Sequence, residues 1–206
     1  MEKADKKTDI LVAAEKLFSE LGYDGTSTRQ IAKESNSNIA MINYYFGSKE
    51  GVFNEIMDNR IAGFNSQLNT IEKENIPAKE KLLKVADKYA SRIFANISFH
   101  KMMQRELSLS QRPEMFGRIR EAMINNLIII EAIIERGISE KQFRKVDTRM
   151  LISSITGTIT NVVVSPGKVM KDPNFDITND KAREILRKRV VAHLQDLLIT
   201  HLTPQK

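Results

Sequence analysis

The side chains that could carry out catalytic or metal chemistry are scattered along this sequence. The three histidines, His100, His193 and His201, lie far apart or without other ligands at metal-binding spacing, and the chain contains no cysteine. The sequence has no paired nucleophile and base and no glycine-rich phosphate-binding motif. We therefore expect no enzyme activity, no catalytic residue, no metal site and no cofactor.

A more informative spacing begins at residue 27. Ser27 and Gln30 form an S-x-x-Q capping box, which is typical of a helix start. Ala32 is small enough for a second helix to cross closely, and Asn36 tolerates the left-handed backbone that a tight turn requires. This spacing predicts a helix-turn-helix with helices at about 27–35 and 38–45. The side chains expected to form its core are Ile31, Ala32, Asn36, Ile42, Tyr45 and Phe46.

Apolar residues recur at helical spacing through nearly the whole chain, and no stretch alternates as a strand would. The first stripe begins at Ile10 and ends at Gly22, which is expected to stop the helix. Residues 127–130 are apolar on every side of their helix, so this helix is expected to be central. The predicted fold class is all-α. The other helices are expected from 49 to about 71, 78–97, 99–110, 113–137, 148–164 and 179–202, with a loop at 165–178.

Length and composition are those of a soluble globular protein, with 206 residues of which 41% are hydrophobic and 28% charged. No apolar run approaches the length of a membrane helix and the N-terminus lacks a signal peptide, so we expect a cytoplasmic protein without a membrane partner.

The net charge is +6, but residues 1–60 contain eight Lys and Arg against ten Asp and Glu. Any attraction of this segment to DNA must therefore come from a few placed groups.

Two stretches flank the predicted helix-turn-helix. Residues 22–32 read GYDGTSTRQIA, and residues 43–50 read NYYFGSKE. Both resemble the N-terminal signature of the TetR family of regulators, and Phe46 and Lys49 stand at the expected offsets from Ile31. The resemblance covers about a quarter of the chain. The sequence departs from the pattern at three positions. In the turn, Ser35 and Asn36 replace the usual Ala and Gly. In the aromatic cluster, Asn43 replaces the common first Tyr.

The resemblance implies that the helix at 38–45 enters the major groove of double-stranded DNA. It also implies that Lys49, with the N–H groups that follow Ser48, binds a phosphate. Ile39 and Met41 are apolar where many members carry polar groups, so contacts with thymine methyl groups are an option and the base sequence is not readable. The residues predicted to contact DNA are Ser27, Thr28, Asn38, Ile39, Ala40, Met41, Asn43, Tyr44 and Lys49.

The resemblance further implies a C-terminal body that binds a small-molecule effector. We expect a DNA-binding domain at 1–50 and a helical effector-binding and dimerisation domain at 51–206, connected by the helix at 51–71. The effector is expected to be largely apolar. The candidate pocket residues are Tyr89, Phe94, His100, Met103, Gln104, Arg105 and Phe116. For each apolar or aromatic candidate, core packing is the favoured alternative, and Arg105 could simply pair with Glu106.

Homodimer formation is expected because two symmetric helix-turn-helix heads match the two half-sites of a palindromic operator. Apolar stripes on the last two long helices would pair with their copies in a four-helix interface. The residues predicted for this interface are Leu151, Ile155, Gly157, Ile159, Val162, Leu186, Val190, Leu194 and Leu197. The alternative that both stripes serve only the core of one chain stays open.

The predicted function is a sequence-specific transcriptional regulator, with repression released by the effector as the default by analogy. Effector binding would move the helix at 50–71 and change the distance between the two heads. Two alternatives remain. An effector-independent DNA-binding protein would agree with the positive charge of the body, and a helical small-molecule enzyme would need a paired nucleophile and base.

Overall fold

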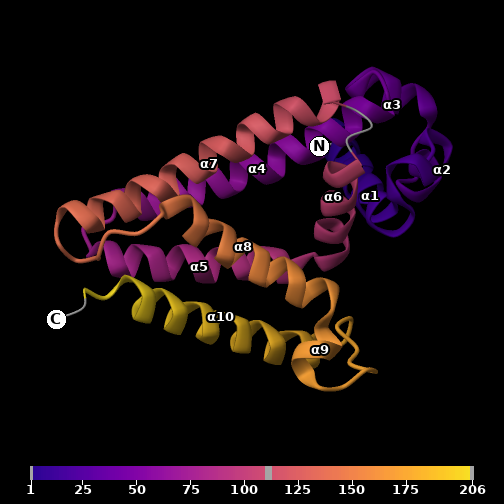
Figure 1. The fold of residues 1–206 in the computed structure, drawn as a ribbon. Coiled ribbons are helices and arrows are strands. Elements are labelled where there is room, and N and C mark those ends of the chain that lie inside the picture. Colours follow the sequence, from indigo (N-terminus) through magenta and orange to yellow (C-terminus); the bar gives the residue numbers. More distant parts are fainter. Residues whose placement is uncertain (1, 110–112, 205–206) are drawn as a thin grey trace. The chain divides into compact units, whose positions relative to one another are not determined.

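Helices connected by short loops form nearly all of the described chain. The computed structural model describes residues 2–109 and 113–204, with the side chains of residues 6–108, 117, 119–121 and 123–204. No strand occurs in these residues, which confirms the predicted all-α fold class, and none of their helices is long and apolar enough to cross a membrane. In chain order the helices are α1 (Glu2–Gly25), α2 (Thr28–Glu34), α3 (Ile39–Phe46), α4 (Lys49–Lys73), α5 (Ala78–Ala95), α6 (Ile97–Leu109), α7 (Pro113–Ser139), α8 (Thr148–Val164), α9 (Pro166–Met170) and α10 (Asp180–Leu202) (Figure 1).

The helices form two compact units. The first contains the chain up to Phe64 together with Ser98–Met123, and the second contains Asn65–Ile97 and the residues from Ile124 onward. The first unit thus contains α1, α2 and α3, most of α4 and α6, and the beginning of α7. The division of the chain into a DNA-binding domain at 1–50 and a body at 51–206 stays a functional prediction.

The core of the first unit is built around three aromatic rings. The ring centroid of Phe18 lies 5.3 Å from that of Phe53 and 5.6 Å from that of Tyr23, and the centroids of Tyr23 and Phe53 are 5.1 Å apart. Ile31 of α2 and Ile42 of α3 are fully buried in the same cluster. Burial of each such side chain contributes about 1.5–3 kcal/mol. The other buried members are Ile10, Ala14, Leu17, Ala32, Val52, Ile56, Met57, Ile61, Phe99, Met102, Met103 and Ile119.

The end of the first helix lies at Gly22, as the sequence predicts. The backbone of Gly22 is not helical, and a short further turn up to Gly25 follows the kink and is included in α1. At the kink, Gly22 has φ 77° and ψ 172°, a conformation that only glycine adopts readily. The buried Thr26 donates its Oγ1 hydrogen to the carbonyl of Gly22 at 2.8 Å. Glycine therefore breaks the helix here, and the chain makes one further turn before α2.

The position of α7 requires a correction. Within one chain this helix is not buried on all sides, because Ile124, Leu127 and Ile128 are 53%, 37% and 53% exposed. Its other face is buried through Ile133 and Ile134. Apolar side chains on every side of a helix indicate that exposing its surface to water costs free energy. They do not show whether the same chain or another molecule covers that surface. The second half of α7 thus leaves one apolar face open.

The centre of the second unit is α5, on which both α8 and α10 pack. Arg187 of α10 connects this helix to α5, because its Nη1 lies 3.2 Å from Oδ1 of Asp87 and 3.0 Å from Oγ of Ser91. Its Nε also donates to the carboxylate of Glu184 at 2.7 Å. The hydrogen bond from Arg187 lowers the pKa of Glu184 below its usual value. Packing and polar contacts therefore fix α10 along α5.

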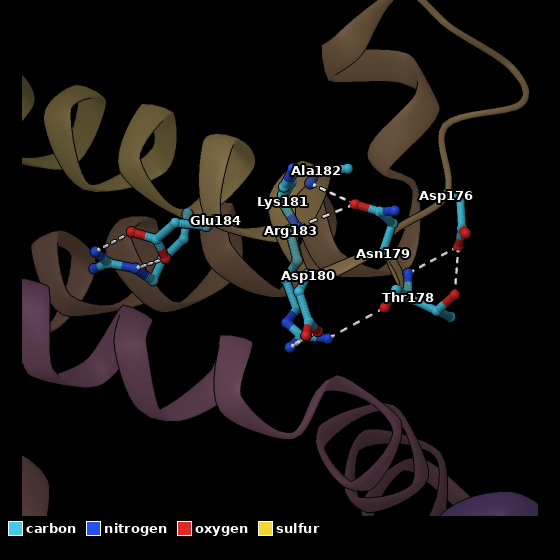
Figure 2. A network of polar contacts seen from close by, with 9 residues as sticks. Asp176, Thr178, Asn179, Asp180, Lys181, Ala182, Arg183 and Glu184 are labelled. Carbon is cyan, nitrogen blue, oxygen red and sulfur yellow. Dashed lines mark hydrogen bonds and ion pairs between the residues drawn. The ribbon is translucent and has the colours of Figure 1, made fainter.

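The loop predicted at 165–178 is partly helical. Its first part forms α9, which begins at Pro166. Figure 2 shows how the second part is held: Asp176 Oδ1 accepts hydrogen bonds from the backbone N and the Oγ1 of Thr178, at 2.9 and 2.6 Å. Asn179 Oδ1 then caps α10 by accepting from the N–H groups of Lys181 and Ala182. A short helix, a turn at Asp176 and the cap of α10 therefore make up most of the segment that was expected to be a long loop.

Candidate nucleic-acid interface

The capping box at the start of α2 is present as predicted. The backbone N of Ser27 donates to Oε1 of Gln30 at 2.8 Å, and the backbone N of Gln30 donates to Oγ of Ser27 at 3.3 Å. These two bonds satisfy N–H groups that have no partner inside the helix. Ser27 is exposed and Thr28 half-buried. The first turn of α2 is therefore fixed and lies at the surface of the first unit.

The turn between α2 and α3 confirms the role predicted for Asn36. Asn36 has φ 48°, in the left-handed region, where Asn is the most favourable residue after Gly. The backbone N of Ser37 donates to the carbonyl of Ala32 at 2.8 Å. Ser35, where the TetR pattern has Ala, is buried and donates its Oγ hydrogen to the carbonyl of Ile31 at 2.7 Å. The unusual serine thus adds a hydrogen bond to the turn.

Helix α3 is anchored on one side and open on the other. Asn38 caps it by accepting the N–H of Met41 at 2.9 Å, and the fully buried Ile42 holds it in the core. Tyr44 is 75% exposed and Ile39 is 38% exposed. The residues predicted to contact DNA that lie exposed on α3 or at its start are Asn38, Ile39, Ala40, Asn43 and Tyr44, with Met41 half-buried. The structure thus brings these predicted residues together on one short, fixed helix.

The two aromatic residues that end α3 are half-buried and contribute to packing. Tyr45 lies edge-on to Tyr44, with 5.1 Å between the ring centroids, and 6.0 Å from Phe46. Lys7 of α1 places its Nζ 5.6 Å from the centre of the Phe46 ring. These contacts agree with the interpretation of Tyr45 and Phe46 as core aromatics.

Lys49, predicted to bind a phosphate, is half-buried and bonded within the first unit. Its Nζ donates to the backbone carbonyls of Tyr23 and Thr26, both at 2.9 Å. The same atom lies 4.3 Å from the centre of the Tyr23 ring. The family signature indicates that a cation belongs at this position, but it does not indicate the direction of the side chain. Two other cations near this site, Arg29 and Lys33 of α2, are exposed.

The candidate effector-binding residues fall into both units. Phe94 is buried and Tyr89 is half-buried on α5 of the second unit, where burial raises the pKa of the Tyr89 hydroxyl. Met103 belongs to the core of the first unit. The other candidates of the first unit are His100, Gln104 and Arg105 on α6, and the side chain of Phe116 lies outside the described residues. Their role in ligand binding stays a prediction.

Arg105 contacts Glu106 and Gly22 within the first unit. Its Nη2 lies 3.1 Å from Oε1 of the buried Glu106, as the alternative sequence interpretation had it. The guanidinium also rests against Gly22, where a Cβ would lie 2.0 Å from Nη2. Arg105 therefore packs on the kink of α1.

Most residues predicted for the dimer interface are buried within one chain. Leu186 and Leu194 of α10 and Ile159 of α8 have no exposed surface. Leu151, Ile155, Val162 and Val190 are also buried, whereas Gly157 is exposed and Leu197 half-buried. The buried side chains support the alternative of core packing, and only the exposed positions of α8 and α10 have surface to place against a second copy.

A capped helix-turn-helix whose second helix exposes one face is typical of DNA-binding proteins. Comparison with known families gives the same class. Residues 10–56 match the model described as "Bacterial regulatory proteins, tetR family", and residues 47–192 match that described as "YsiA-like protein, C-terminal region". The second match spans more than half of the chain. The chain belongs to the TetR family, and it is a DNA-binding transcriptional regulator.

Three relatives illustrate the similarity. The fatty acid metabolism regulator protein of Bacillus subtilis is 28% identical over 177 residues, which cover 85% of this chain and 90% of the relative. The HTH-type transcriptional repressor NicS of Pseudomonas putida is 45% identical over 65 residues, which cover 31% of each chain. The crystal structure of the transcriptional regulator FadR of Bacillus subtilis in complex with stearoyl-CoA is 26% identical, with a TM-score of 0.72, and covers 94% of this chain and 98% of FadR.

Proposed function

We propose that this protein is a homodimeric repressor that leaves a palindromic operator when it binds a long-chain fatty acyl-CoA thioester. The observation that carries the choice of effector is the open apolar face of α7. Ile124, Leu127 and Ile128 stand at i, i+3 and i+4 and therefore share one side of the helix. Their exposed fractions of 53%, 37% and 53% are high for isoleucine and leucine.

An acyl chain is a suitable cover for this face. Each methylene group that leaves water contributes about 0.8 kcal/mol, so a long chain gains binding free energy along the whole face. The similarity to a FadR that binds stearoyl-CoA supports the same class of ligand. The thioester would be bound and not cleaved, so the proposal includes no catalysis. It also places the protein in the cytoplasm, where acyl-CoA and the operator are both accessible.

The proposed DNA contacts come from α2 and α3. Ser27 and Thr28 would bind the DNA backbone at the first turn of α2, and the exposed side chains of α3 would enter the major groove. Tyr44 is the most exposed large side chain of α3. The proposed contact residues are Ser27, Thr28, Asn38, Ile39, Ala40, Met41, Asn43 and Tyr44.

The proposed dimer uses the faces of α8 and α10 that α5 does not cover. On α8, Met150 and Val164 are 63% and 52% exposed, and on α10, Ile185 and Ile199 are 59% and 37% exposed. Gly157, between the two exposed residues of α8, allows a close approach of helices. Pairing of these faces across a twofold axis would give a four-helix interface.

The effector can lower DNA affinity only by the ratio of its affinities for the two states of the dimer. We propose that α4, which contributes to both units, changes position between these states. The free dimer would match the spacing of two half-sites, and the acyl-CoA-bound dimer would not.

The test is fluorescence anisotropy of the purified protein with DNA from upstream of its own gene, against scrambled DNA. We expect preferential binding to the upstream DNA that stearoyl-CoA weakens and coenzyme A alone does not. Ile128→Glu should abolish the response to stearoyl-CoA and retain DNA binding. Asn125→Glu, an exposed neighbour on α7, controls for the added charge.

The other outcomes select the alternatives. Equal binding to scrambled DNA with strong salt dependence would indicate an effector-independent, non-specific DNA-binding protein. Sequence-preferring binding that no acyl-CoA changes would refute the proposed effector. Turnover of the acyl-CoA without DNA binding would indicate a helical enzyme.

A further inference from the structure

Lys49 holds the corner between α1 and α2. Its Nζ donates to the carbonyls of Tyr23 and Thr26 at 2.9 Å each, and it lies 4.3 Å from the centre of the Tyr23 ring. These carbonyls belong to the last turn of α1 and the residue that follows it. A cation at the C-terminal end of a helix is stabilised by the partial negative charge of the carbonyls there.

The partners of Lys49 are themselves buried and bonded. Tyr23 is buried between the rings of Phe18 and Phe53, with centroid distances of 5.6 and 5.1 Å. Thr26 is 1% exposed and donates to the carbonyl of Gly22 at 2.8 Å. The ammonium therefore binds carbonyls of a packed, buried corner and not of exposed surface groups.

This corner leads directly into the proposed DNA contacts. Ser27 follows Thr26 and caps α2, and Thr28 is the first residue of that helix. A shift of the Thr26 carbonyl would therefore move the first turn of α2. The corner also connects α4, which begins at Lys49, to the helix-turn-helix.

We infer that Lys49 is a positioning residue: it acts on DNA binding through the corner at residues 22–26 and not through contact with a phosphate. Two of the three ammonium donors bind the Tyr23 and Thr26 carbonyls and the group lies on an aromatic face, so the corner sets its position. The inference rests on the DNA binding by α2 and α3 proposed above. It assigns the effect of this cation to the orientation of α2.

Salt dependence separates the two roles. Each phosphate contact contributes about 0.9 to the slope of log affinity against log salt concentration, so loss of one contact per head would lower the slope of a dimer by about 1.8. For a positioning residue, Lys49→Ala should weaken operator binding about tenfold or more at every salt concentration and leave the slope unchanged. Lys73→Ala, at the other end of α4, removes the same charge and should change neither quantity.

Hydrogen exchange gives a measurement that needs no DNA. In Lys49→Ala, amide exchange at residues 26–31 should rise about tenfold or more, and it should stay unchanged in Lys73→Ala. Lys49→Met retains the apolar stem against Tyr23 without the donors, so it tests the same bonds if the alanine variant folds poorly.

A slope lowered by about 1.8, or unchanged hydrogen exchange in both Lys49 variants, would overturn the inference. If the wild-type protein does not prefer its operator, the proposed DNA contacts fail. The exchange measurement then still decides whether Lys49 holds the corner.

Discussion

Replacement of Gly22 by alanine tests the kink of α1, because two separate costs meet at this residue. Gly22 has φ 77° and ψ 172°, and a residue with a Cβ is strained there by about 1–3 kcal/mol. The new Cβ would also lie 2.0 Å from Nη2 of Arg105. The guanidinium is the end of a flexible, largely exposed side chain that can move aside at small cost, so the backbone strain of about 1–3 kcal/mol should make up most of the loss in the free energy of unfolding.

A double-mutant cycle separates the two costs. With alanine in place of Arg105, no guanidinium lies against Gly22, and Gly22→Ala should cost only the backbone strain of about 1–3 kcal/mol. The difference between the two backgrounds is the coupling of Arg105 to the kink. This coupling should be positive if the guanidinium rests on Gly22 in solution.

The assay is urea unfolding followed by circular dichroism, together with thermal melting. A loss of 1 kcal/mol corresponds to about 2–4 °C in Tm for a chain of this size. Gly63→Ala is the matched control, because Gly63 lies exposed in α4 and a new Cβ there would meet no atom within 4 Å outside the adjacent helix backbone. It should gain about 0.5–1 kcal/mol from helix propensity. If Gly22→Ala is as stable as this control, the kink or the assignment of its cost is wrong.

Three further predictions concern single side chains. Ser27→Ala removes the cap of α2 and should lower the free energy of unfolding by about 1 kcal/mol, as measured in urea. Tyr44→Ala should weaken operator binding in anisotropy with an unchanged Tm, since Tyr44 is 75% exposed; a large fall in Tm would instead indicate a structural role. Because Arg187 lowers the pKa of Glu184 from its usual 4.5, this pair stabilises the folded state above that pH. The stabilisation should be lost as the pH falls through the lower, folded-state pKa. Arg187→Leu should reduce this acid dependence in urea titrations, and an unchanged pH profile would contradict it.

Local rules were sufficient for the helix-turn-helix. The capping box of Ser27 and Gln30 and the left-handed turn at Asn36 depend on residues only a few positions apart, so the sequence contains all the partners. Helix periodicity likewise identified the long helices. At Gly22 the same rules located the break in α1 but not its continuation, because the extra turn depends on Thr26 and on packing.

Contacts between distant segments could not be predicted in this way. The stripe through Leu186 and Leu194 is apolar whether α5 or a second chain covers it, and only the structure shows that α5 does. The same limit applies to α7, where the apolar run at 127–130 indicated a central helix and two of its residues, Leu127 and Ile128, are exposed. For Lys49 the family signature gave the position of the charge, and the direction of its side chain follows from the fold of Tyr23 and Thr26.

Helix α4 has polar attachments at both of its ends. At its start, Lys49 holds the corner before α2. In the second unit, Asn65 Nδ2 donates to Oδ1 of the buried Asn126 at 2.8 Å, and Glu72 lies 3.8 Å from Arg136. An amide pair with one buried partner fixes the register of two helices, because a shift would leave the buried Asn126 without this hydrogen bond. Since Asn126 lies on α7 beside the proposed acyl-chain face, a ligand that displaces α7 would carry α4 with it. The free energy available for this movement is limited to the difference between the affinities of the acyl-CoA for the two states.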